Sequence, residues 1–512
     1  MIRHSVSGSK MGINNYYISS FFWSTLAKIL NAILGFISVP LLLGYYGKAE
    51  YGILSIATAC NGYMHLLDLG MNTGTVKFFS LWKAEGKQTL IYQVARTNIS
   101  FYLLVACVNV IALVALALFG EELFSVTHEQ FLQLRMCLFI IAIFSIFSWI
   151  TTVFNQLLIA DKKIGFTMQV QCGQILLKML LVLVVLWLNL SLSVYFFCLT
   201  ALLALLLLPY AIKCRKEQLI DSLKPAAYWK EFRIVLTFSL SIFTLSLFQV
   251  TATQSRSIIL SIFSSNGAET VSEYRILEVI PQLIILIGGT FSGIFLPKVS
   301  EMVAQNNQQE IEHFAYRWTT LTTVLANILC IPFIFCASEV LSAYVGVGYA
   351  NLSKWLIVWC LIVLMQIHTT PCNALIMAYG RMKLLIITSA IACVLSIVIN
   401  IVLCSRYEVG SAIVGYLVYI LIVIGLYYIV YYKKIVNLSR WRMFRCFIVP
   451  TLISLLMLVL ASLIPMKMEW FSIFDERLQY ISICIIKSLL WLIPYLALLC
   501  GLHIVDLKLF RK

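Results

Sequence analysis

Four basic residues fall inside long apolar runs of the sequence: Lys28, Lys178, Arg256 and Lys487. A charged group in hydrocarbon is costly, so it faces a water-filled cavity or a polar partner by default. Lys28 lies roughly eight residues, or ~12 Å, into the run 20–43, and Lys178 lies near the middle of its run. Such cations suit charge-assisted hydrogen bonds to an anionic group such as a phosphate. The alternative is that the long side chain reaches the membrane surface. We expect this of Lys487, and it fits Arg256 better than Lys178.

Three further ionisable residues are candidates for ion coupling: Glu278, His368 and Asp68. Glu278 lies one turn into an apolar run beside Arg275, so an ion pair and a proton or cation site both remain open. His368 is able to titrate near neutral pH, or to form a hydrogen bond between helices. Asp68 fits a helix cap or a partner for Lys77 as well as a coupling site.

The sequence contains no pattern of a nucleotide or metal site. GxxxxGK[ST] and HExxH motifs and Cys/His ligand spacings do not occur, so we expect no cofactor, no metal and no ATP-driven transport. Nearly all of the 15 Cys lie in apolar runs, where they act as small hydrophobic residues. The outside loops predicted below have roughly fifteen residues at most. They leave no room for the acid and base of a membrane glycosyltransferase or polymerase, so we expect no enzyme.

The composition indicates a membrane protein. Of 512 residues, 61% are hydrophobic and 12% are charged, whereas soluble domains have about 45–50% and about 25%. This excludes a soluble enzyme, a secreted disulfide scaffold and a disordered chain. A bilayer core of about 30 Å needs roughly 20 apolar residues per helix, and open strands cannot cross it. The sequence therefore predicts an all-α integral membrane protein with about 14 transmembrane helices, near residues 20–43, 51–69, 98–119, 132–160, 164–188, 191–212, 234–263, 274–296, 318–338, 352–378, 382–404, 409–431, 444–464 and 479–503.

The distribution of Lys and Arg predicts the orientation. With the N-terminus in the cytoplasm, 26 of the 37 basic residues lie inside and seven lie outside, and we read no signal peptide before the first span. We therefore expect both termini in the cytoplasm, with Asn189 and the loop 465–478 outside. The net charge of +15 then faces the anionic inner leaflet. This predicts membrane lipids, and not nucleic acid, as partners.

A duplication organises the chain. The pattern TTxxNxLxxA occurs at 151–160 and again at 369–378, 218 residues later, each time before a basic turn. This offset pairs spans 1–6 with spans 7–12 in the same orientation, as in parallel-repeat transporters. We expect two six-helix lobes around a central cavity plus a C-terminal helix pair, with Lys28 and Arg256 lining opposite lobes. The expected limits are 1–212 for the N-terminal lobe, 213–233 for a basic cytoplasmic linker, 234–432 for the C-terminal lobe, and 433–512 for the extra pair and tail.

The chain resembles a known family in three short strings: Tyr51-Gly52-Ile53-Leu54, the stretch 67–72 (Leu-Asp-Leu-Gly-Met-Asn) and Val76-Lys77-Phe78. Together with the 6 + 6 + 2 arrangement they are similar to Wzx-type flippases of O-antigen or capsule repeat units, in the multidrug/oligosaccharidyl-lipid/polysaccharide exporter superfamily. The resemblance implies an oligosaccharide on undecaprenyl pyrophosphate as substrate, moved from the inner to the outer leaflet of a bacterial cytoplasmic membrane. It also implies the polysaccharide polymerase machinery as a possible partner.

Three other functions remain as alternatives. A multidrug or cation exporter of the same architecture would place acids at mid-membrane, where this chain has Lys and Arg. A membrane glycosyltransferase or polymerase would need a substantial external loop. A scaffold derived from a flippase would have lost the cations of the cavity.

Overall fold

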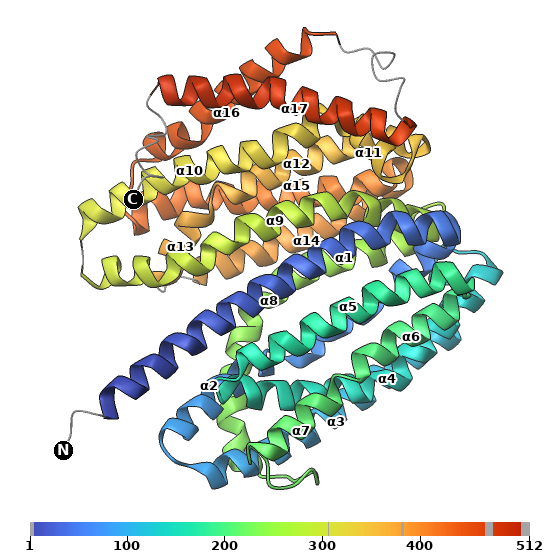
Figure 1. The fold of residues 1–512 in the computed structure, drawn as a ribbon, viewed down its shortest axis with the longest axis vertical. Helices are drawn as coiled ribbons and strands as arrows, with labels where there is room; N and C mark the ends of the chain where they lie inside the picture. Colours follow the sequence, from blue (N-terminus) through green and yellow to red (C-terminus); the bar gives the residue numbers. More distant parts are fainter. Residues whose placement is uncertain (1–4, 306, 380–382, 466–474, 503–512) are drawn as a thin grey trace. The chain divides into compact units, whose positions relative to one another are not determined.

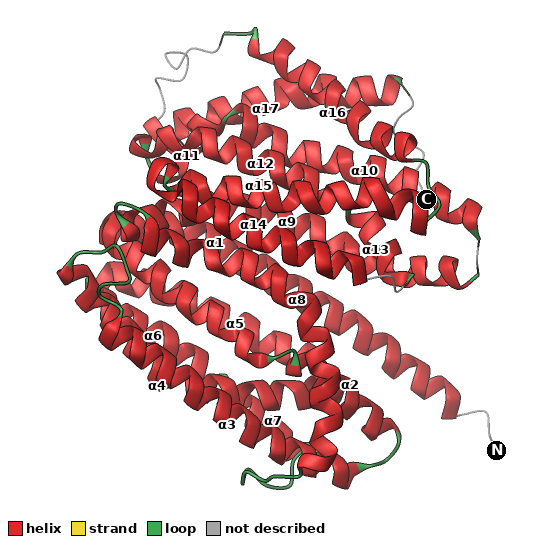
Figure 2. Cartoon of the chain, turned by 180° about the vertical axis from the view of Figure 1, so that it is seen from behind, coloured by secondary structure: helices red, strands yellow, loops and turns green. Residues whose placement is uncertain are grey.

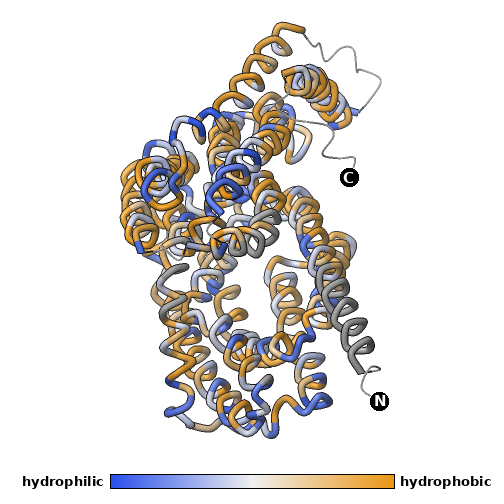
Figure 3. Tube along the Cα trace, turned by 90° about the vertical axis from the view of Figure 1, so that its left-hand side faces the viewer, coloured by the Kyte–Doolittle hydropathy of each residue, from blue (hydrophilic) through white to orange (hydrophobic). Residues whose placement is uncertain are grey.

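The computed structural model describes residues 5–305, 307–379, 383–465 and 475–502. Within these ranges every regular element is helical and no strand occurs (Figure 2). Most of the chain is hydrophobic, with hydrophilic residues confined to short stretches (Figure 3). The predicted all-α fold is therefore confirmed. Most of the predicted outside loop 465–478 lies beyond the described residues.

Eleven of the described helical segments are long and apolar enough to cross a membrane. The predicted seventh and eighth spans lie in α8 (Trp229–Phe263) and α9 (Gly267–Ala304), which are not among these eleven, so the count of 14 stays a prediction. The eleven segments are Phe22–Asp68, Gln88–Phe119, His128–Ala160, Ile164–Leu188, Leu192–Lys216, Gln308–Phe335, Val347–Ile367, Lys383–Tyr407, Val409–Ile435, Arg440–Ser462 and Glu476–Gly501.

The chain forms two compact units, Met1–Ser272 and Glu273–Lys512. In the first unit α1 packs on α5, α3 packs on α4, and α8 packs on α1, α2 and α3 (Figure 1). Its elements are α1 (Ser5–Met64), η1 (His65–Asp68), α2 (Met71–Ala84), α3 (Gln88–Phe119), α4 (His128–Ala160), α5 (Ile164–Leu188), α6 (Leu192–Ala204), α7 (Leu207–Lys216) and α8.

Two breaks shape the start of the first unit. Gly47 adopts φ 79° and ψ 172° inside α1, a conformation open to glycine, and it separates the first predicted span from the second. A second break follows η1, where Leu69 and Gly70 have φ of 52° and 73°. A Cβ on Gly70 would lie 2.6 Å from the carbonyl oxygen of Ser239 in α8. This close approach lets the helices α2 and α8 pack tightly.

The helix α8 is fastened to the first unit at both ends. At one end, the Ser125 N–H donates to the carbonyl of Ser261 (2.7 Å), and the Ser125 carbonyl accepts from the N–H of Gly267, the first residue of α9 (2.6 Å). At the other end, the Tyr228 N–H donates to the hydroxyl of Thr97 on α3 (2.9 Å). These bonds explain why α8 belongs to this unit, although the duplication places it after the linker.

This placement bears on two of the candidate cations. Arg256 lies on α8 and Lys28 lies on α1, and both fall within the compact unit Met1–Ser272. The expectation that they line opposite lobes stays a prediction. The predicted linker 213–233 likewise lies inside the first unit. The duplication matches spans by sequence, whereas the compact units follow packing and hydrogen bonds.

In the second unit α14 packs on α15, and α10 packs on α12 and α16. The predicted tenth span is divided at His368, because Pro371 lacks an amide hydrogen and favours the start of a new helix. The elements are α9, α10 (Gln308–Phe335), α11 (Ala337–Val345), η2 (Val347–Leu352), α12 (Ser353–Ile367), α13 (Thr370–Ala378), α14 (Lys383–Tyr407), α15 (Val409–Leu426), the π-helical η3 (Tyr427–Ile435), α16 (Arg440–Ser462) and α17 (Glu476–Gly501).

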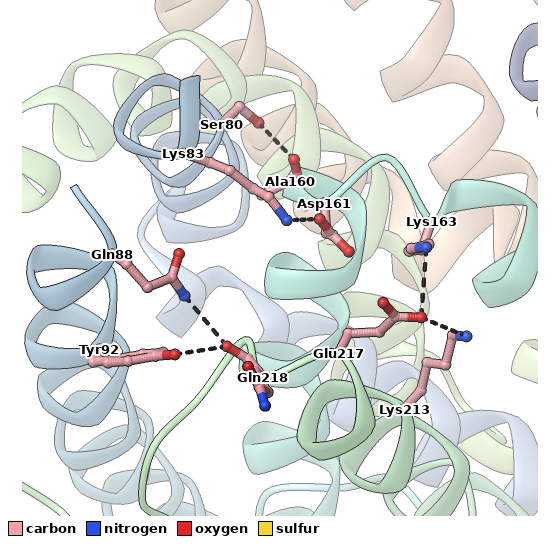
Figure 4. Close-up of polar contacts among 10 residues, drawn as sticks. All are labelled: Ser80, Lys83, Gln88, Tyr92, Ala160, Asp161, Lys163, Lys213, Glu217 and Gln218. Atoms are coloured by element: carbon pink, nitrogen blue, oxygen red, sulfur yellow. Dashed lines mark hydrogen bonds and ion pairs between the residues drawn. The ribbon is translucent and has the colours of Figure 1, made fainter. Parts of the chain in front are cut away.

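Ion pairs hold the end of α7 against neighbouring turns of the first unit (Figure 4). Glu217 contacts Lys213 at 2.8 Å and Lys163 at 3.5 Å. Close by, Lys83 of α2 pairs with Asp161, which follows α4. The hydrogen bond from Lys213 and the charge of Lys163 lower the pKa of Glu217 below its ordinary value.

This lowered pKa predicts a pH dependence of stability. Because the folded chain holds Glu217 ionised, its contribution is present above the unfolded pKa and is lost as the pH falls through the folded pKa. We expect Glu217→Gln to lower the unfolding temperature in detergent near neutral pH, and the difference from wild type to vanish in acid. Glu122→Gln, at an exposed position, is the matched control. A difference that is constant over the whole pH range would contradict the assignment.

Candidate functional site

The three candidate substrate-binding residues lie on α1 and on two helices that pack against it. Lys28 is on α1, Lys178 on α5 and Arg256 on α8, and α1 packs on both of the others. Lys28 is exposed and Lys178 is half-buried. Arg256 is only 5% exposed, and its Nε donates to the carbonyl of Ala252 at 2.9 Å. Of these three residues, Arg256 has a buried guanidinium group, whereas the amines of Lys28 and Lys178 belong to more exposed side chains.

Lys28 and Lys178 lie at similar levels along α1 and α5, two packed helices that run in the same direction. Ala27 of α1 packs with Cys172 and Ile175 of α5, and further along, the Tyr46 hydroxyl donates to the carbonyl of Leu190 (3.0 Å). In this register Lys178 lies about one turn beyond Lys28, or ~5 Å along the axis. The sequence did not reveal that these two helices pack on each other.

Asp68 belongs to a chain of hydrogen bonds that joins η1, α3 and α4. Its Oδ1 accepts from the Tyr102 hydroxyl at 2.5 Å, and its Oδ2 accepts from the Asn72 N–H at 3.2 Å. Gln156 donates its Nε2 to the Tyr102 oxygen (2.8 Å), and Asn98 donates its Nδ2 to Gln156 (2.7 Å). Tyr102, Gln156 and Asn98 are fully buried. Asp68 therefore caps the start of α2 and anchors it to the interior of the unit.

This network of hydrogen bonds predicts that a small substitution strongly lowers the stability of the protein. Tyr102→Phe removes the donor to Asp68 and the acceptor for Gln156, and leaving buried polar groups unpaired costs about 1–3 kcal/mol. We expect a lower unfolding temperature of the purified protein in detergent. Tyr92→Phe, which removes an exposed bond from α3 to Gln218, is expected to change it less. Equal effects of both substitutions would argue against a structural role of this hydrogen-bond network.

The two candidate coupling residues of the second unit already have partners. Glu278 accepts from the Arg275 guanidinium at 2.6 Å and from the Tyr274 hydroxyl at 3.3 Å. The ion pair that the sequence left open is therefore present. His368 is 1% exposed, and its Nε2 lies 3.3 Å from the Tyr428 hydroxyl. The structure thus holds both residues in side-chain contacts, and a role in ion coupling stays a prediction.

Sequence reasoning missed several polar residues. Asn98, Tyr102 and Gln156 carry no charge, so a search for ionisable residues passes over them; their position in apolar runs was the available signal. Lys487, for which the sequence favoured contact with the membrane surface, pairs with Glu339 at 2.5 Å. Among the residues that the structure describes, no group of three or more His, Cys, Asp or Glu could hold a metal ion.

Comparison with known proteins identifies the family. The family described as "Polysaccharide biosynthesis protein" matches residues 18–303, which is more than half of the chain. The chain belongs to this family. A comparison with curated protein sequences gives no match.

Solved structures share the fold of this family member. A lipid II flippase, MurJ, in an inward closed conformation has a TM-score of 0.69 at 16% identity, covering 95% of this chain and 99% of the other. An inward-facing multidrug resistance MATE family transporter of the MOP superfamily has a TM-score of 0.66 at 12% identity, covering 77% and 92%. A MOP superfamily transporter from Pyrococcus furiosus has a TM-score of 0.51 at 12% identity, covering 82% and 95%. The chain therefore has the fold of membrane transporters and flippases.

Proposed function

We propose that this protein is a Wzx-type flippase. It moves an oligosaccharide linked to undecaprenyl pyrophosphate from the inner to the outer leaflet of a bacterial cytoplasmic membrane, by alternating access. In this proposal both termini lie in the cytoplasm and the product passes to a polysaccharide polymerase. Lys28, Lys178 and Arg256 bind the substrate.

The family match carries this proposal, and the likeness to the lipid II flippase supports it. The likeness covers 95% of the chain, so it extends into the 62-residue stretch from α16 to α17. The MATE transporter covers 77% of the chain and leaves nearly a quarter of it without a counterpart. The extra length is a feature shared with a flippase of a lipid-linked substrate.

The charges of the first unit fit an anionic headgroup. A pyrophosphate must lose part of its hydration to cross the bilayer, and Lys or Arg replaces it with charge-assisted hydrogen bonds. The half-buried Lys178 on α5 and the buried Arg256 on α8 offer such bonds. A cationic drug would be repelled by the same residues, which favours a phosphate-bearing lipid over a multidrug substrate.

Reconstitution tests the proposal directly. Purified protein in proteoliposomes is supplied with a fluorescent lipid-linked oligosaccharide, and an impermeant enzyme or quencher reports how much has changed leaflet. We expect faster movement than in protein-free vesicles, and no accumulation of a cationic dye in parallel vesicles. Dye transport without lipid movement would assign the protein to multidrug export instead.

A further inference from the structure

A groove lies between the middle of α2 and the start of α8 in the first unit. It is an open groove on the surface of the unit, with a volume of about 560 Å³. Phe78 comes from α2, and the remaining lining residues come from the first three turns of α8. The lining residues are Phe78, Lys230, Arg233, Ile234, Thr237 and Phe238.

Polarity changes in order along the groove. Tyr228 and Trp229, both exposed, precede the lining residues and mark a membrane–water interface, where such aromatic rings collect. Lys230 and Arg233 follow within the first turns of α8, and both are exposed. Ile234, which is 56% exposed, begins the apolar part. The groove is thus cationic near the surface and apolar toward the bilayer.

A third cation lies at the edge of the groove. The Nζ of Lys77 is 3.7 Å from the ring centroid of Phe238 and 5.7 Å from that of Phe78. Within the described part of the chain, Lys77, Lys230 and Arg233 form no ion pair with a carboxylate. Three positive charges around two aromatic rings therefore remain available to an anion.

We propose that this groove binds an anionic glycerophospholipid of the surrounding leaflet. The phosphate lies between Lys230 and Arg233, with Lys77 as the third cation, and an acyl chain lies along Ile234 and Phe238. Basic pockets between membrane helices bind anionic headgroups in this way, most strongly on the cytoplasmic side. The lipid is a resident of the membrane and not the transported substrate; the assignment of its leaflet rests on the orientation that we propose above.

Lipid binding to the purified full-length protein tests this proposal without any transport measurement. Native mass spectrometry compares retention of phosphatidylglycerol with retention of phosphatidylcholine, whose headgroup has no net charge. We expect the wild type to prefer phosphatidylglycerol. We expect K230Q/R233Q to retain one bound phosphatidylglycerol about 25-fold more weakly, since each basic residue contributes about fivefold. Both side chains are exposed, so the unfolding temperature of the lipid-free variant should stay unchanged.

Two further variants keep the result decisive. K433Q/K434Q removes the same charge at two exposed positions of η3 and should bind like wild type. K230R/R233K keeps both charges and should also retain the lipid.

Equal retention of both phospholipids, or loss of binding in K230R/R233K, would overturn the proposal. Displacement of phosphatidylglycerol by a lower concentration of polyprenyl pyrophosphate would assign the groove to the transported lipid instead. A failure of transport in proteoliposomes with intact lipid selectivity would refute only the proposed function.

Discussion

We expect Lys28→Ala and Arg256→Ala each to abolish surface polysaccharide while the protein remains in the membrane. Each substitution removes a positive charge that the proposed pyrophosphate needs, and a hydrogen bond to a charged group contributes about 1.5–3 kcal/mol. Surface polysaccharide in a strain that lacks its own flippase measures the effect, with membrane abundance followed by immunoblot.

Conservative variants separate charge from packing. Lys28→Arg should keep part of the activity, because the charge persists while its shape changes. Arg256 is buried and bonded to Ala252, so its removal also leaves a space, and Arg256→Lys is the better test of charge at this position. Normal export by both Ala variants at wild-type abundance would show that neither residue binds the substrate.

The second large effect that we expect is that of the membrane potential on transport. The sequence has no nucleotide-binding motif, and an inside-negative potential favours outward movement of an anion by about 2.3 kcal/mol per charge per 100 mV. A pyrophosphate diester with about two charges would gain roughly twice that. Lys28, Lys178 and Arg256 lower the barrier to this passage, but fixed charges supply no net work.

A potassium gradient with valinomycin sets the potential in proteoliposomes at constant pH. An inside-negative potential should speed net outward movement of the fluorescent lipid-linked sugar, and collapse of the gradient should return it to the basal rate. If the transport rate does not change with the potential but depends steeply on a proton or sodium gradient, the mechanism is antiport. Glu278, His368 and Asp68 then become the residues to substitute.

Hydropathy predicted the helices well, because the requirement for a long apolar run is local in sequence. It did not predict how they break and pack. The break of the tenth span at His368 has a local signal in the sequence, Pro371. The hydrogen bond between Tyr102 and Asp68 has none, because it joins residues 34 positions apart and no periodicity predicts such a partner. The compact units show the same limit: the repeat is a property of sequence, but the fastening of α8 to the first unit depends on bonds such as that of Ser125 with Ser261.

The stretch between α7 and α8 is held along α3 mainly through its own main chain. Side chains of α3 donate to its carbonyl groups: Gln88 and Tyr92 to that of Gln218, Arg96 to that of Lys224, and Ser100 to that of Ala226.

Since every residue type offers the same carbonyl, the identity of these three acceptor residues matters little for the bonds. The donors on α3 have no such freedom, because each bond needs a particular side chain. The two sides of this contact therefore differ in their tolerance to mutation. Substitutions of the acceptor residues in the irregular stretch should leave these hydrogen bonds in place, whereas substitutions of the donor side chains on α3 should remove them.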